Sequence, residues 1–271
     1  MSNALGEYLR ARRELIDPAE AGLRVVGVRR TPGLRREEVA TLAGISADYY
    51  LRLEQGRDRN PSPQVLEALA RVFRLDEVST QYLLSLSSAR PAKPRREVVP
   101  AGIRQLLDVI NLPAFVESRT FEVLAANRLA SAVSPNIRPG VNRLRAIFLD
   151  PVEQELYPDW DKVARGLVAG FRASVGSDVT DPRIVQLVGE LSLGSETFRK
   201  LWARHDVTAL AGGSLRLHHP EFGELELRRE KLPIADSGGQ ILAIYHAEPG
   251  SPAASVFESL TAGDAEIKQA R

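Results

Sequence analysis

The sequence predicts an all-α N-terminal domain followed by an α+β domain with an antiparallel sheet. Apolar residues recur at helical spacing through the first ninety residues, with capping and glycine signals between the runs. The segment Ser87–Pro100 is rich in proline and basic residues and poor in apolar ones, as an exposed linker is. After this segment, short β-prone stretches stand on both sides of a series of helical patterns. We therefore expect domains at residues 1–90 and 101–271, joined by a linker at 91–100.

Five short helices are expected in the first domain. Leu5 and Leu9 belong to a first helix that ends before Pro18, and a loop follows to Pro32. Ser46 and Ser62 are favourable N-caps, and Gly44 is a favourable helix end. The remaining helices are expected over residues 34–43, 47–55, 63–73 and 77 to about 87.

The second domain begins with a β-hairpin pattern, in which residues 114–118 and 122–125 flank a turn at Arg119 and Thr120. Leu215 and Leu217 alternate with polar residues, Leu225 and Leu227 do the same, and residues 241–245 form an apolar run. The order of elements therefore predicts five strands around a helix-rich middle, with a last helix over 253–260. The middle helices are expected over 127–133, 143–148, 160–175, 182–193 and 196–204.

The composition excludes several classes of function. The 271 residues include no cysteine, so disulfides, thiolate nucleophiles and cysteine-ligated metals are excluded. No apolar run approaches the roughly 20 residues that cross a bilayer, and the N-terminus lacks a secretory pattern, so we expect a cytoplasmic protein that does not span a membrane. Residues 1–97 hold 17 basic and 13 acidic side chains, whereas the remainder holds 19 and 22. This difference favours a polyanion partner for the first domain.

The span Glu37–Arg57, EEVATLAGISADYYLRLEQGR, predicts a helix-turn-helix. This motif needs two helices that pack across each other through a tight turn, and the second helix enters the major groove of DNA. Val39, Ala40 and Ala43 offer a small packing face before Gly44, and Tyr50 and Leu53 offer the opposing core. The sequence thus predicts a double-stranded DNA operator as partner.

The outward face of the second helix is then expected to read bases with Ala47, Asp48, Tyr49 and Arg52. An arginine can bind guanine through two hydrogen bonds, an aspartate can accept from cytosine, and an alanine can contact a thymine methyl group. Two alternatives stay open, because Asp48 also stabilises a first helical turn and Arg52 can form a solvated pair with it. Glu54 is instead expected to pair with Arg13 in a structural ion pair.

A second group of residues is expected to contact DNA phosphates, because helix N-termini and exposed arginines suit them. Two belong to the loop over residues 18–32, called the basic loop below. Two stand at helix N-termini, and three lie in the turn after the helix expected over 47–55. They are Arg29, Arg30, Ser46, Arg57, Arg59, Asn60 and Ser62.

The LAGIS turn and the LEQGR ending resemble the Cro/C1-type (XRE) helix-turn-helix domain. More narrowly, GLRREEVATLAGISADYYLRLEQGR resembles the MmyB-like transcription regulators, which have a long loop between their first two helices. The blocks PAFVESRTFEVLAANRLA, NRLRAIFLDP, LYPDW, FRKLWARHDV, HHPEFGELELRREKL and AIYHAEPGSP resemble the ligand-binding domain of that family. The resemblance therefore extends over nearly the whole chain.

This resemblance implies a PAS-like second domain, in which helices cover one face of the sheet and enclose a small-molecule cavity. It implies a small apolar effector, with a fatty acid or similar lipidic carboxylate as the ligand class, and no other cofactor. Candidate lining residues are large apolar side chains on helices and strands, together with two polar ones for the carboxylate. They are Asn142, Arg145, Phe148, Phe171, Trp202, Leu217, Leu225, Leu227 and Ile244. Each apolar residue could equally belong to an ordinary core, and Arg145 to an ordinary ion pair.

We expect a homodimer that binds a pseudo-palindromic operator, with half-sites about 34 Å apart. Two alternatives remain: a second domain that only dimerises, and an enzyme tethered to DNA. No catalytic or metal site is predicted, because the chain lacks a Gly-x-Ser-x-Gly motif and the adjacent residues His218 and His219 would point to opposite faces of a strand. His219 is expected to lie buried and hydrogen-bonded in a turn that leads to Gly223.

Overall fold

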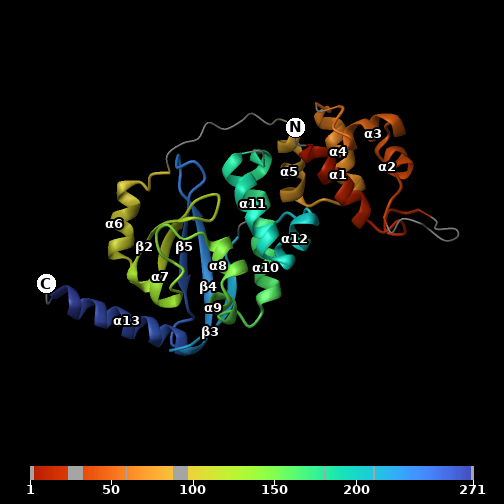
Figure 1. The fold of residues 1–271 in the computed structure, drawn as a ribbon. Coiled ribbons are helices and arrows are strands. Elements are labelled where there is room, and N and C mark those ends of the chain that lie inside the picture. The colour runs from red at the N-terminus through yellow and green to blue at the C-terminus, as the bar shows by residue number, and fades with distance from the viewer. Residues whose placement is uncertain are drawn as a thin grey trace.

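The computed structural model describes residues 3–23, 33–58, 60–87, 97–179, 181–209 and 211–269. It has the two parts that the sequence predicts, a helical N-terminal head and an α+β domain with a five-stranded sheet (Figure 1). The second part is called the ligand domain below. Among the described residues, no helix is long and apolar enough to cross a membrane.

The head contains the five predicted helices. They are α1 (Ala4–Leu15), α2 (Arg36–Ala43), α3 (Ala47–Glu54), α4 (Pro63–Val72) and α5 (Glu77–Ser87). The local signals act as expected: Ser46 caps α3 by accepting from the Tyr49 amide, and Ser62 caps α4 by accepting from the Val65 amide. Gly44 ends α2 at φ 69°, in the left-handed region that suits glycine. The basic loop lies mostly outside the described residues.

Glu54 joins three helices of the head through two ion pairs made by its buried carboxylate. Its carboxylate accepts from Arg13 Nε at 2.6 Å and from Arg36 Nε at 2.7 Å, and its side chain is only 3% exposed. Arg13 also donates to the carbonyl of Leu34. The predicted pair of Glu54 with Arg13 is therefore confirmed, and it fixes the end of α3 against α1 and α2.

The sheet has the order β2-β1-β5-β4-β3, and every neighbouring pair is antiparallel. Its strands are β1 (Ala114–Glu117), β2 (Val123–Ala126), β3 (Gly213–His219), β4 (Gly223–Pro233) and β5 (Ile241–His246). All five predicted strands are present, and β4 continues well beyond Leu227. Strand β3 lies at one edge of the sheet.

One face of the sheet carries the main core and most of the helices. These are α7 (Arg128–Val133), α8 (Arg143–Leu149), α9 (Pro151–Glu155), α10 (Trp160–Val175), the 3-10 helix η1 (Gly176–Asp178), α11 (Pro182–Gly194) and α12 (Glu196–Ala203). The last helix, α13 (Pro252–Gln269), extends beyond the predicted end at 260 and projects from the body (Figure 1). Figure 1 shows α10 and α12 between the sheet and the head. The core includes an edge-to-face contact between Phe121 and Phe171 at 5.9 Å.

Among the described residues, two α-helices and the short 3-10 helix η1 are absent from the sequence prediction. Helix α6 (Ala101–Val109) covers the other face of the sheet, where Ile103 and Leu107 pack against Val116 and Leu242. Helix α9 has only five residues, too few to produce a helical period. The expectation of helices on one face is thus correct for the main layer and incomplete for α6.

Replacing Glu54 by alanine is expected to lower the free energy of unfolding of the head by about 3–5 kcal/mol, because the buried Arg13 loses its charged partner. Denaturant unfolding followed by circular dichroism measures this change. The matched control is Asp48→Ala, which removes an exposed pair on the same helix and should cost about 0.5 kcal/mol or less. Similar losses for the two variants would contradict the structural role of Glu54.

The same ion pairs predict an acid-dependent loss of stability. Burial would raise the pKa of Glu54, but hydrogen bonds from Arg13 and Arg36 outweigh it, so its pKa lies below the ordinary 4.5. The stabilisation is therefore fully present above about pH 4.5 and decreases as the pH falls through the lowered pKa. A titration of unfolding free energy against pH should show this component in the natural protein and lack it in Glu54→Gln.

Candidate nucleic-acid interface and ligand cavity

Helix α3 presents the predicted reading face to solvent. Ala47, Asp48 and Arg52 are exposed and Tyr49 is half-buried, whereas Tyr50 and Leu53 are fully buried in the head core. This separation follows from the 3.6-residue period, which the burial of Tyr50 and Leu53 fixes in register. Figure 1 shows α3 on the side of the head away from the ligand domain. Ala47, Asp48 and Arg52 on its outward face are thus accessible in the described part of the chain.

Arg52 is held by its own helix. Its guanidinium pairs with the Asp48 carboxylate one turn earlier and stands 5.8 Å from the centre of the Tyr49 ring. The solvated pair considered from the sequence is therefore present in the free protein. Both side chains remain accessible, with Arg52 45% and Asp48 70% exposed. An exposed pair of this kind is weak and can be exchanged for contacts to a base.

The predicted phosphate contacts border α3. Ser46 stands at the N-terminus of α3, Ser62 at the N-terminus of α4, and Arg57 and Asn60 lie in the connection between these helices; all four are exposed. Helix N-termini carry partial positive charge, so these positions suit anions. The other three candidates, Arg29, Arg30 and Arg59, lie outside the described residues.

The polar residues proposed for the ligand already have partners. Asn142 caps α8 through the amides of Leu144 and Arg145 and donates to the carbonyl of Thr120. Arg145 forms a two-pronged ion pair with Glu190 at the surface. The neighbouring Arg143 is the buried arginine of this block, and it pairs with Glu153 at 2.8 Å. Asn142 and Arg145 therefore have structural roles in this domain, because their polar groups bond to other residues of the chain.

The apolar candidates occupy the cores. Phe148, Phe171, Leu217, Leu225 and Leu227 are buried in the main core, and Trp202 packs against it. Ile244 instead belongs to the cluster under α6, on the opposite face of the sheet. None of the nine predicted ligand residues lines the cavity described next, and one of them, Leu227, lines the depression beside it.

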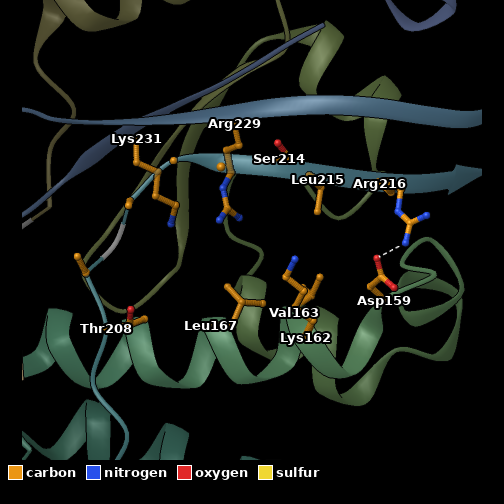
Figure 2. A pocket seen from close by; sticks show the side chains of 15 residues that line it. Asp159, Lys162, Val163, Leu167, Thr208, Ser214, Leu215, Arg216, Arg229 and Lys231 are labelled. Atoms are coloured by element: carbon orange, nitrogen blue, oxygen red, sulfur yellow. Dashed lines mark hydrogen bonds and ion pairs between the residues drawn. The ribbon is translucent and has the colours of Figure 1, made fainter.

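A cavity of about 310 Å³ lies between α10 and the edge of the sheet at β3 and β4. Figure 2 shows Val163 and Leu167 reaching into it from α10, with Leu215 reaching from β3. Residues 208, 209 and 211–213, which lead into β3, complete the wall. A second depression of about 450 Å³ shares Leu215 and adjoining residues with it. The volume lies at the lower end of the range for small-molecule sites.

The cavity carries an excess of positive charge. Lys162, Arg216, Arg229 and Lys231 line it against a single carboxylate, Asp159. Arg216 pairs with Asp159 at 2.6 Å, as the dashed line in Figure 2 marks, and Lys231 pairs with Glu117. The Nε atom of Arg229 is buried and has no hydrogen-bond partner in the described part of the chain. A buried donor of this kind costs free energy until an acceptor arrives.

Lys231 is the most buried cation of the cavity, with a side chain 3% exposed. Burial lowers its pKa, and the positive charges of Arg229 and Arg143 act in the same direction, whereas Glu117 opposes them. The cavity therefore concentrates positive charge that an anion would stabilise.

The alternation of residues along β4 could have identified Arg229 and Lys231 from the sequence. Leu225 and Leu227 were expected to face the core, and residues two apart on a strand share a face. Continuing β4 by four residues brings Arg229 and Lys231 to the same side, above α10 (Figure 2). The sequence prediction names only Leu225 and Leu227 on this strand and does not include these two cations.

A family model for the MmyB-like transcription regulator ligand binding domain matches residues 99–260, more than half of the chain. The chain belongs to this family. A helix-turn-helix domain model matches residues 4–83. The MmyB-like chain thus joins a DNA-binding head to a ligand-binding domain, which is the architecture of a ligand-modulated transcription regulator. A comparison with curated proteins finds no significant match.

Three histidine side chains of the MmyB-like domain have partners within the chain. His219 is buried and accepts from the amides of Glu221 and Phe222, as the predicted turn requires. His218 pairs with Glu224 and His246 contacts Glu230, both near the surface. Within the described ranges, no group of three histidine, aspartate or glutamate side chains could hold a metal ion.

Proposed function

We propose that this regulator binds a pseudo-palindromic operator as a homodimer and that an amphipathic anion in the cavity modulates this binding. The observation that carries the ligand proposal is the buried, unpartnered Nε of Arg229 beside Val163 and Leu167. A ligand with a carboxylate at one end and an apolar chain at the other satisfies both features. A fatty acid, the ligand class inferred from the resemblance, has this chemistry. The proposed site of action is the cytoplasm, where the sequence places it.

The cavity favours a ligand-binding role over a domain that only dimerises, because a solid core would leave no room beside α10. It also favours binding over catalysis. The one carboxylate among its lining residues, Asp159, is held by Arg216, and no histidine lines it. Acid–base catalysis uses titratable groups that converge on a substrate.

DNA binding by a dimer can be tested directly by genomic footprinting, which returns the operator and its symmetry together. Two half-sites separated by one helical turn, about 34 Å, are expected. Light scattering on the purified protein gives the oligomeric state independently. A single asymmetric half-site together with a monomeric protein would overturn the dimer proposal.

Arg52→Ala is expected to cost about 1–3 kcal/mol of binding free energy at one operator position and to relax sequence preference there, because a two-pronged contact to a base is lost. Binding titrations against the operator and its single-base variants measure this. An equal loss on every sequence would refute base reading by Arg52.

Arg57→Ala is expected to weaken binding evenly on all sequences, because a phosphate contact carries no sequence information. The slope of log K against log salt should fall by about one unit. Arg10→Ala, which changes an exposed arginine of α1, is the control and should leave the slope unchanged. A sequence-dependent loss would reassign Arg57 to base reading.

Arg229→Ala is expected to weaken binding of a fourteen-carbon fatty acid by about tenfold or more, because a charge-assisted hydrogen bond is worth roughly 1.5–3 kcal/mol. Calorimetry on the full chain measures the affinity, and mass spectrometry of the purified protein identifies any ligand carried from the cell. The matched variant Arg145→Ala removes the arginine favoured by the sequence and should bind normally, since Arg145 pairs with Glu190. The reverse order of effects would move the anion site to Arg145.

A further inference from the structure

The head rests on the ligand domain through a buried contact. On the head side lie α1 and α5, with Tyr8 and Tyr82 fully or almost fully buried. On the other side lie α10, η1 and the residues that follow α12. Val207, which follows α12, is 8% exposed and packs within the apolar core of the head. A residue of the ligand domain therefore completes the core of the head.

Two arginines cross this contact from opposite sides. Arg12 of α1 donates to the carbonyl of His205 and pairs with Asp206 at 3.3 Å. Arg172 of α10 donates to the carbonyl of Trp202, lies 3.7 Å from the centre of its ring, and interacts electrostatically with Tyr82 of α5. The two domains are thus joined by polar contacts as well as by Val207.

Some buried polar atoms in this contact have no hydrogen-bond partner in the described part of the chain. The Nε atoms of Arg12 and Arg172 and the Nδ1 atom of His205 are buried without a hydrogen-bond partner among the described residues. Burial and the charges of Arg172 and Arg12 lower the pKa of His205 to about 3, so its ring is neutral at physiological pH. Asp206, which also pairs with Arg204, is the acid that faces these cations. Buried polar atoms without partners make an interface less stable than its area suggests.

The contact shares two elements with the cavity. The connector, residues 204–213 with Leu210 outside the described part, touches the head through His205, Asp206 and Val207 and then lines the cavity from Thr208 onwards. Helix α10 does the same, since Val163 and Leu167 line the cavity and Arg172 reaches the head.

Two close contacts tie the connector to its neighbours, one on α10 and one on β4. The Thr208 amide donates to the carbonyl of Ala169 on α10. Gly212 packs so closely on β4 that a Cβ atom there would lie 2.4 Å from the carbonyl oxygen of Arg229. A shift of α10 or of β4 at the cavity is therefore passed to the connector through these contacts.

We propose that the connector couples cavity occupancy to the head, so that filling the cavity displaces residues 205–207 and loosens the contact made by Arg12 and Val207. The proposal rests on the proposed function, because the cavity is the ligand site. A looser contact lets the head move relative to the ligand domain, and this movement changes the affinity of the protein for DNA.

The absence of cysteine from the chain allows the cavity to be filled covalently, without any natural ligand. Val163→Cys places a single thiol in the cavity wall, and a decyl methanethiosulfonate adds an apolar chain to it. The matched control is Val152→Cys with the same label, because Val152 is 64% exposed on α9. Leu167→Cys, one turn further along α10, repeats the test if the first variant fails to fold.

Hydrogen exchange and operator titrations on the full chain are the two measurements. Labelling at Val163 should speed amide exchange in α1 and α5 and change operator affinity by about fivefold or more, whereas labelling at Val152 should change neither. Exchange changes confined to the ligand domain, with operator affinity unchanged within twofold, would overturn the coupling. That result would leave the ligand proposal standing, because fatty acid binding is measured separately.

A second variant tests the route. Arg12→Gln, made in the Val163→Cys background, removes the charge that reaches Asp206, so the change in operator affinity on labelling should fall below about twofold. Arg10→Gln alters a neighbouring arginine that pairs with Glu14 on α1 and should keep the full response. An undiminished response in Arg12→Gln would show that coupling does not pass through this contact.

Discussion

The burial of α10 on three sides is the constraint on which the rest of the structure depends. Phe171 faces the sheet and meets Phe121, and Arg172 stacks on Trp202 of α12 and reaches Tyr82 of the head. Burying a large apolar side chain such as Phe171 contributes about 1.5–3 kcal/mol, so the helix cannot shift on one side without loss on the others. Core, cavity and head contact therefore share one rigid element.

Charge has two different uses in this protein. In the head, Glu54 is buried but accepts from Arg13 and Arg36, and in the ligand domain Arg143 is buried but pairs with Glu153. These groups are satisfied within the chain and hold its frame together. Arg229 differs, because its Nε is buried beside apolar residues without an acceptor. This unpaired donor beside the cavity is the feature on which the ligand proposal rests.

Much of the fold was predictable because its signals are local. The hydroxyl groups of Ser46 and Ser62 satisfy amides three residues away, and Gly44 adopts a conformation that few other residues tolerate. Strand alternation around Leu217 and Leu225 likewise depends on near neighbours. Helix α6 was missed although Ile103 and Leu107 have helical spacing, because the preceding proline-rich segment obscured its start.

By itself, the sequence determined the two domains, their helices and strands, the outward face of α3 and the pairing of Glu54 with Arg13. Each of these follows from periodicity, from caps or from a charge with one obvious partner. Only the tertiary structure decided that Arg145 pairs with Glu190 of another helix, whereas the buried Nε of Arg229 has no hydrogen-bond partner among the described residues. The contact of Arg12 with the connector is likewise visible only in the tertiary structure. A cavity and a domain contact form where elements distant in sequence come together. Local sequence patterns do not show which distant elements will be in contact.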